Sequence, residues 1–134
     1  MGLERTVAVV QKVRSVYETD LYAPIFERIR QMSGATLGSS DETDRALYIL
    51  ADHARAMAFL IADGVRPGNQ RREYVLRRII RRATLQAYGR LGIGAEGVAD
   101  LAEVVVDYMG DVYEELKEAR EDIRRIVVAE AARF

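Results

Sequence analysis

The sequence predicts an all-α fold, a single domain of five to six helices packed as a bundle with roughly orthogonal crossings. Apolar residues recur with the helical period along most of the chain, and runs of β-branched residues are few. The 134 residues are 49% hydrophobic and 31% charged, which is typical of one globular domain that can bury its own core. We expect residues 1–134 to form one domain, because no internal repeat or low-complexity linker divides them.

The first two helices are expected at about 3–16 and 21–32. Pro24 is compatible with the second helix, because it falls in the first turn, where a backbone N–H has no helical partner in any case. Ser33 and Gly34 end that helix, and the sequence GATLGSS at 34–40 predicts a loop.

A long third helix is expected from Ser39 to Ala62. Ser39 followed by Glu42 is a capping-box pattern, in which the hydroxyl and the carboxylate each accept from a free backbone N–H at the helix start. Gly64 occupies the position of a left-handed residue after the last turn, and Pro67 prevents the helix from continuing.

Three further helices complete the prediction. The fourth starts near Asn69 and ends before Gly92, and the last two cover about 96–109 and 111–132. The last helix carries a narrow apolar seam formed by Val112, Leu116, Ala119, Ile123 and Ile126. Such a seam is typical of a helix that packs on another helix. We expect packing inside the bundle, with a coiled-coil partner or a neighbouring domain as the alternative.

The composition excludes several classes of site. With no cysteine and one histidine, the chain cannot build a disulfide framework or a thiolate metal site. No apolar stretch reaches the roughly 20 residues that span a bilayer, and no basic-then-apolar leader opens the chain, so we expect a cytoplasmic protein without a membrane partner. We also expect no catalysis by this chain alone, because no nucleophile–base pair or phosphate-cradling glycine loop is evident. His53, on the apolar side of the third helix, is expected to be a partly buried core residue.

Charge is distributed unevenly along the chain. Residues 65–92 carry eight arginines and one acid, a net charge of +7, although the whole chain has a net charge of −1. Residues 93–134 carry five bases and eleven acids, a net charge of −6. The location of charge decides the local field, so the basic segment is a candidate site for an anionic partner.

The fourth helix places its arginines on one arc. With Arg77 at 0° and about 100° per residue, the other arginines fall between roughly 40° and 140°. They are Arg71, Arg78, Arg81 and Arg82. Tyr74 and Tyr88 project into the same arc. The opposite arc is apolar and is formed by Val75, Leu76, Ile79, Ile80, Ala83 and Ala87. One side of this helix is therefore expected to enter a core while the other side is almost purely guanidinium.

Two interpretations of the basic arc remain open on charge alone. Like-charged i,i+4 pairs such as Arg77 with Arg81 destabilise a helix slightly, so an unrelieved cluster indicates a function. Arginine donates two parallel hydrogen bonds to phosphate, and interleaved tyrosines are typical of a nucleic-acid surface. Alternatively, the acidic segment that follows covers the arc in an intramolecular salt-bridge network. The protein is then a helical interaction or structural domain that binds no nucleic acid.

The stretch YILADHARAMAFLIADGVRPGNQRREYVLRRIIRRA at 48–83 resembles the tRNA-recognition segment of alanyl-tRNA synthetases. The family pattern is an ADHxRA helix followed by FxIxDGVxPSNExRGYVLRRIIRRA. This chain departs from it with Gly68 for Ser, Gln70 for Glu and Glu73 for Gly. MGLERTVAVVQ at the start resembles the end of motif 3 of class II synthetases, YETDLYAPIF at 17–26 resembles YDTDLFxPLI, and the ending VVAEAARF resembles a family ExxxF segment.

The resemblance implies a helical acceptor-stem recognition domain of a larger synthetase whose catalytic core and editing domain are absent here. The implied partners are the acceptor stem of tRNA(Ala) and the catalytic domain of the same enzyme, which attaches alanine to tRNA. Asn69 is implied to help read a G·U wobble pair, and an N-cap is its simplest other role. The other implied RNA contacts are Arg71, Arg72, Tyr74, Arg77, Arg78, Arg81 and Arg82.

The resemblance to motif 3 concerns ATP. Gly2 and Arg5 match the motif whose arginine contacts ATP in the family, and this contact is expected only in the full-length enzyme. ATP and Mg²⁺ are therefore implied cofactors of that enzyme. This chain is expected to hold no cofactor and no metal ion.

Overall fold

The computed structural model describes residues 22–134, and they form an all-α fold as predicted. The helices are α2 (Ala23–Ser33), α3 (Asp41–Ala62), α4 (Arg71–Leu91), α5 (Ala95–Met109), α6 (Glu114–Glu118) and α7 (Arg120–Arg133). The helix predicted at 3–16, together with Gly2 and Arg5, lies outside the described residues. No helix among residues 22–134 is long and apolar enough to cross a membrane.

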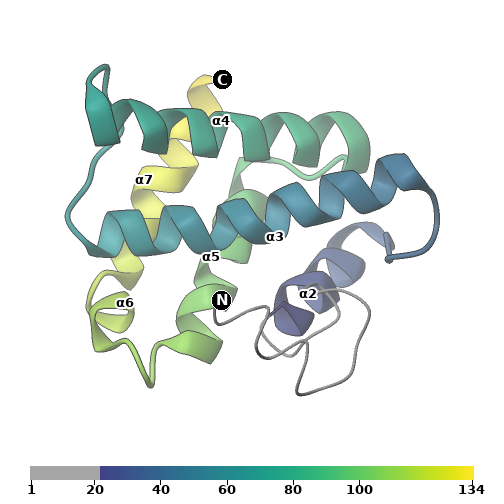
Figure 1. The fold of residues 1–134 in the computed structure, drawn as a ribbon, viewed down its shortest axis with the longest axis horizontal. Coiled ribbons are helices and arrows are strands. Elements are labelled where there is room, and N and C mark those ends of the chain that lie inside the picture. Colours follow the sequence, from purple (N-terminus) through teal and green to yellow (C-terminus); the bar gives the residue numbers. More distant parts are fainter. Residues whose placement is uncertain (1–21) are drawn as a thin grey trace, which may run out of the picture.

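Helices α3 and α4 lie side by side and run in opposite directions, while α5 and α7 cross them steeply (Figure 1). Helix α3 has the central position, because it contacts α4, α5 and α7. One core joins all the described helices. Its largest fully buried side chains include Ile25, Leu47, Leu50, Met57, Ile61, Leu76, Ile80, Leu101, Leu116 and Ile123. The periodic apolar positions therefore form the core.

The ends of the first two described helices follow local chemistry. Pro24 lies in the first turn of α2, and Gly34 ends that helix in the left-handed region with φ of 79°. The N-cap of α3 is Ser40, whose hydroxyl accepts from the Thr43 backbone N–H at 3.1 Å. The prediction of Ser39 was wrong by one residue, because the Ser39 hydroxyl donates to the Thr36 carbonyl in the preceding turn. Gly64 has φ of 95°, as its position after α3 predicted.

The predicted helix 111–132 is two helices. The chain bends at Ala119, which has φ of −94° and ψ of 3° between α6 and α7. The bend lets α6 place Leu116 against α3 while α7 packs mainly on α5. Four of the predicted seam residues are buried or half-buried inside the bundle, as expected, whereas Val112 precedes α6 and is 78% exposed. Tertiary packing thus overrides the uninterrupted helical pattern of this segment.

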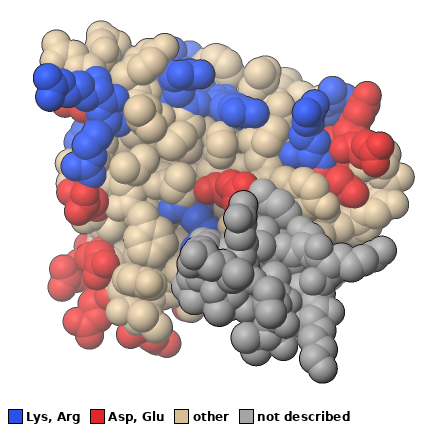
Figure 2. Space-filling view, viewed as in Figure 1, with Lys and Arg blue, Asp and Glu red and all other residues tan. Residues whose placement is uncertain are grey.

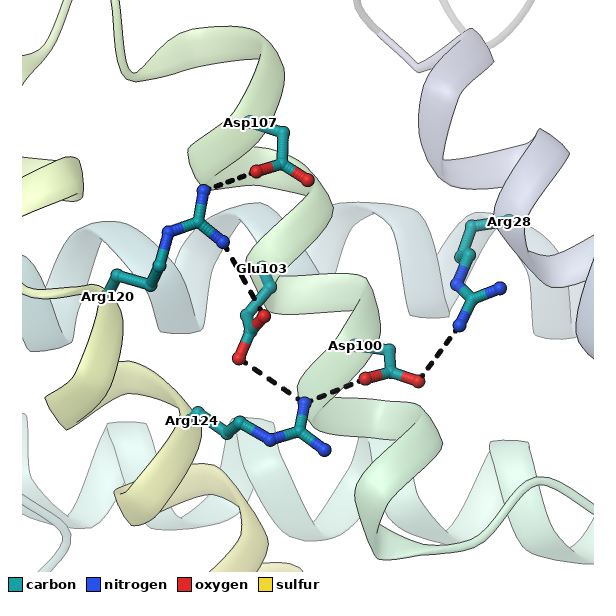
Figure 3. Close-up of polar contacts among 6 residues, drawn as sticks. All are labelled: Arg28, Asp100, Glu103, Asp107, Arg120 and Arg124. Atoms are coloured by element: carbon teal, nitrogen blue, oxygen red, sulfur yellow. Dashed lines mark hydrogen bonds and ion pairs between the residues drawn. The ribbon is translucent and has the colours of Figure 1, made fainter.

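Ion pairs connect the helices on the side of α5 (Figure 3). Asp100 accepts from Arg28 of α2 at 3.1 Å and from Arg124 of α7 at 2.7 Å. Glu103 accepts from Arg124 at 3.3 Å and from Arg120 at 3.5 Å, and Arg120 also contacts Asp107. We call these six residues the α5 ion-pair ladder. Every arginine in the ladder faces at least one carboxylate.

Candidate nucleic-acid interface

Helix α4 is oriented by its apolar side. Leu76, Ile80, Ala83 and Ala87 are buried, as the helical projection predicted. Val75 was expected on that side and is instead 49% exposed, because the core contacts a narrower arc of the helix than the projection assumed. Thr84 was not predicted to be buried. Its hydroxyl donates to the Ile80 carbonyl at 2.7 Å, which satisfies this polar group inside the core.

The arginine arc divides into two pairs. Arg77 and Arg81 each donate from Nε to the same oxygen of Glu130 in α7, at 2.9 Å and 3.2 Å. The Glu130 side chain is only 3% exposed, so this carboxylate is buried beneath the two guanidinium groups. For Arg77 and Arg81, the alternative of an intramolecular salt-bridge network is therefore correct.

The second pair, Arg78 and Arg82, remains exposed. Within residues 22–134, no carboxylate lies within ion-pair distance of either side chain. The Arg78 guanidinium lies over the Tyr74 ring, 5.8 Å from its centroid. In the space-filling view, Lys and Arg side chains gather over α4 and Asp and Glu side chains over α6 (Figure 2). The described part of the chain therefore presents cations along α4 that it does not neutralise itself.

A surface cavity of about 440 Å³ lies beside this exposed pair. It is lined by His53, Val75, Arg78, Ile79, Arg81, Arg82, Leu85 and Phe134. The Arg81 guanidinium lies 5.8 Å from the centroid of the Phe134 ring. A lining that combines arginines with apolar side chains suits an anionic group attached to a flat or apolar one, as in a nucleotide.

His53 lines this cavity and is half-buried, as predicted. Burial lowers the pKa of its imidazole below 6.5, and the nearby Arg82 cation lowers it further. His53 is therefore neutral at pH 7, and a phosphate placed in the cavity would favour its protonated form.

The loop before α4 carries Asn69. The N-cap of α4 is Gln70, which makes no side-chain capping bond, so the simpler role suggested for Asn69 was wrong. Asn69 is exposed, and its Oδ1 accepts from Arg77 Nη1 at 2.6 Å. The next residue but one, Arg71, has φ of 49°, in the left-handed region that side chains other than glycine seldom adopt. Arg72 pairs with Asp63 across the loop.

Two departures from the family pattern explain each other. A Cβ atom at Gly68 would lie 2.3 Å from Glu73 Oε1 and 2.9 Å from Glu73 Cβ. The Gly68 N–H also donates to the Glu73 carbonyl at 3.1 Å, so the two residues face each other across the turn. A side chain at position 68 and the Glu73 side chain would therefore compete for the same space in this turn.

The chain is similar to known proteins over its whole length. The family model described as tRNA synthetases class II (A) matches residues 1–134. The chain belongs to this family. An alanine–tRNA ligase of Rubrobacter xylanophilus is 71% identical over 134 residues, which is all of this chain and 15% of that protein. Alanine–tRNA ligases of Dehalococcoides mccartyi and Thermobifida fusca are 44% and 42% identical, again over all of this chain and 15% of theirs. The chain thus spans about 15% of the length of these synthetase relatives.

Two site residues were not predicted from the sequence. Glu130 holds Arg77 and Arg81, and Phe134 lies against Arg81 in the cavity. The ExxxF segment contained the available signal, because i,i+4 spacing along a helix puts two side chains on the same side, and Phe134 directly follows the last residue of α7. Which helix that side would meet could not be read from the spacing. Among residues 22–134, no group of three His, Cys, Asp or Glu could hold a metal ion.

Proposed function

We propose that this chain binds the acceptor stem of tRNA(Ala) through α4 and the loop before it. We further propose that it does so within an alanine–tRNA ligase, supporting the ATP-dependent attachment of alanine to tRNA. The names of the relatives support the assignment to an alanine–tRNA ligase. The match over the whole chain supports the proposal that it corresponds to one segment of such an enzyme. The acceptor stem as the binding partner is the more specific part of the proposal.

The exposed pair of Arg78 and Arg82 is the observation that carries the proposal. These side chains lie one turn apart on α4, beside a cavity, and no carboxylate among the described residues neutralises them. Guanidinium groups bind phosphate oxygens in pairs of parallel hydrogen bonds. A duplex backbone offers phosphates in a regular row, so two adjacent cations on one helix suit it.

The remaining predicted residues have auxiliary roles in this proposal. Tyr74 lies beside Arg78 and limits where its guanidinium group can go. Arg71 is exposed at the first turn of α4, and Arg72 forms an exposed pair with Asp63 that a phosphate can replace at little cost. Asn69 is the residue of this group that is suited to base edges, because its amide has both donors and an acceptor.

A helical interaction domain without nucleic-acid binding is the second candidate. The ion pairs of Arg77 and Arg81 with Glu130 favour this second candidate, because these two cations already have a buried partner. It leaves Arg78 and Arg82 without a role, so we prefer RNA binding.

Titration with RNA at several salt concentrations tests the proposal. We expect the 134-residue chain to bind a short acceptor-stem duplex and to bind it more weakly as salt is added. A plot of log Kd against log salt concentration should be a straight line whose slope is roughly 0.7 to 0.9 for each phosphate contact. The matched control is Arg30→Gln, which removes an exposed arginine of α2 that pairs with Glu27. It should leave the affinity unchanged. Binding that is absent at low salt, or that does not vary with salt, contradicts the proposal.

The other partners belong to the longer enzyme. ATP, Mg²⁺ and the catalytic domain remain proposals for that enzyme, with Gly2 and Arg5 as its ATP contacts in this chain. A cytoplasmic location is proposed on the same grounds. If this chain by itself catalysed an alanine-dependent exchange between ATP and pyrophosphate, the proposal that the ATP chemistry requires the longer enzyme would be contradicted.

A further inference from the structure

A second cavity, of about 410 Å³, lies between the end of α4, the start of α5 and the end of α7. Its lining contains no charged residue. The large side chains of the lining are Leu85, Tyr88 and Phe134, and each of them is more than half exposed. Apart from Thr84, the other lining residues are glycines and alanines. We call this cavity the α4–α7 groove.

The groove has room for a segment of another molecule. A Cβ atom added at Gly89 or Gly94 would meet no heavy atom within 4 Å. Where residues lack side chains, a second backbone can approach closely. Exposed apolar surfaces that are bordered by polar residues are typical of protein–protein contacts. The groove therefore suits an apolar side chain carried by a protein segment.

The border of the groove is basic. Residues 84–95 and 131–134, which supply its lining, contain two arginines and no acid. Of these two, Arg90 pairs with the exposed Glu42 at 2.9 Å. Arg133 is exposed and has no ion-pair partner among residues 22–134, and the exposed Arg82 lies one turn before Leu85 on α4. A partner segment that complements this border carries acids next to its apolar residue.

The same chain exposes a segment of that kind at residues 111–115, with the sequence DVYEE. Val112 has the most exposed large hydrophobic side chain in the described part of the chain. The neighbouring Tyr113 packs edge-on against Phe59, with ring centroids 5.1 Å apart. Glu114 and Glu115 are exposed and have no ion-pair partner within residues 22–134. We call residues 111–115 the acidic tip.

The acidic tip and the groove lie at opposite ends of α7 (Figure 1). The tip leads into α6, which precedes α7, whereas the groove is lined by the last residues of α7 and by Phe134. With 14 residues, α7 is about 20 Å long. One molecule therefore cannot place its own tip in its own groove, but two molecules can pair the two surfaces.

We propose that the acidic tip of one molecule docks into the α4–α7 groove of a second copy of this chain. Val112 enters the groove, and Glu114 and Glu115 face the arginines at its border. The contact is head-to-tail, because the two surfaces differ, so it extends into longer assemblies or closes a ring. A contact of this small size has a Kd on the order of 100 µM. It uses neither Arg78 nor the loop before α4, so it does not depend on the proposed function.

Sedimentation equilibrium of the 134-residue chain without RNA tests the proposal. The average mass should rise above the 15.1 kDa of one chain as the concentration increases from about 10 µM to about 1 mM. Association should weaken as salt increases from about 50 mM to about 500 mM, because salt screens exposed charges. The mass of a single chain at every concentration, or association that does not respond to salt, overturns the proposal.

Two substitutions address the two surfaces separately. Gly89→Gln fills the groove, and the fold tolerates it because the added Cβ atom meets nothing and glutamine favours helix more than glycine does. Val112→Gln removes the apolar side chain of the tip at an exposed position. Each should weaken self-association by at least about tenfold. The matched control is Val75→Gln, at an exposed valine outside both surfaces, which should leave self-association unchanged. An equal loss in the control overturns the proposal.

Mixing the two variants tests the head-to-tail contact. Gly89→Gln keeps an intact tip, and Val112→Gln keeps an intact groove. The mixture should therefore form a one-to-one dimer and no larger species, although each variant alone remains a monomer. If the mixture forms no dimer, the tip does not enter the groove, and a symmetric contact or a different partner accounts for any self-association of the unmodified chain.

RNA binding by the same variants keeps the two proposals distinct. Both variants retain Arg78 and Arg82, so the affinity for the acceptor-stem duplex should stay within about twofold. If no duplex binds to the unmodified chain, the proposed function fails and the self-association is unaffected. If Gly89→Gln weakens duplex binding and leaves self-association unchanged, the groove belongs to the RNA site and the inference is wrong.

Discussion

Helix α4 and the α5 ion-pair ladder contain the same kinds of residue and use them differently. In the ladder, Arg28, Arg120 and Arg124 each face one or two carboxylates (Figure 3). On α4, two arginines share a single buried glutamate, and Arg78 and Arg82 face no carboxylate among the described residues. The number of arginines therefore says little about binding. The arginines that the fold leaves without a partner are the ones that can bind an anion.

The largest expected effect is at the junction of the two regions. Glu130→Ala removes the buried carboxylate that Arg77 and Arg81 share, so at least one guanidinium group loses its partner while it remains partly buried. We expect the free energy of unfolding to fall by about 3 kcal/mol. Urea unfolding followed by circular dichroism measures it. A loss no larger than that of an exposed pair such as Arg125–Asp122 would mean that the pair is not structural.

The second prediction compares the loss of two arginines from α4 with the loss of two arginines from the α5 ion-pair ladder. Arg78→Gln with Arg82→Gln should weaken binding of the acceptor-stem duplex by about 30-fold at low salt and reduce the salt slope by about two phosphate contacts. Stability should change by less than about 0.5 kcal/mol, because neither side chain has an ion-pair partner among the described residues.

The matched control is Arg120→Gln with Arg124→Gln, which removes the same charge from the ladder. It should cost about 1 to 2 kcal/mol of stability, because the Arg120 and Arg124 side chains are 41% and 38% exposed and solvent screens their ion pairs. It should leave RNA affinity unchanged. If the ladder variant lost RNA binding as strongly as the α4 variant, net charge rather than position would govern binding.

The third prediction concerns the turn that carries Asn69. Gly68→Ser places a Cβ atom against Glu73 and should destabilise the domain by about 1 to 2 kcal/mol. Glu73→Gly removes the obstacle and costs roughly 0.5 to 1 kcal/mol in the first turn of α4. The double variant should be more stable than the sum of the single changes by about 1 kcal/mol. Additive changes in the measured unfolding free energies would show that the two departures are independent.

The smallest effect is the pH dependence that His53 contributes. Burial and Arg82 lower the pKa of His53 in the folded state, so the unfolded chain binds a proton more readily. The contribution of His53 to stability is therefore complete above its unfolded pKa of about 6.5 and declines as the pH falls from there towards the folded pKa. His53→Gln should remove this part of the pH dependence.

NMR titration measures the His53 pKa directly, because the chain has one histidine and its imidazole signal is unambiguous. Bound duplex RNA should raise the pKa, since phosphate near Arg82 favours the imidazolium form. An unchanged pKa on saturation with RNA would mean that phosphate does not approach the cavity.

Much of the fold could be predicted from local patterns. The bounds of α4 and α5 differ from the predicted ones by at most two residues, because Gly92 and the apolar period act within a few residues. The error at Ser39 and the single helix predicted for α6 and α7 have different causes. Two adjacent serines offer the same cap, and only contacts with α3 and α5 select the bend at Ala119.

The sequence by itself determined α2 to α5, most of the apolar side of α4, the arc of arginines and the family, since all four depend on residue type and spacing along one chain segment. Only the tertiary structure decided which arginines are free. Glu130 lies 53 residues from Arg77, and eleven acids follow the basic segment. Spacing cannot tell which of those acids packs against α4. The packing of α7 on α4 makes that choice, so that Arg77 and Arg81 are held and Arg78 and Arg82 remain available to a ligand.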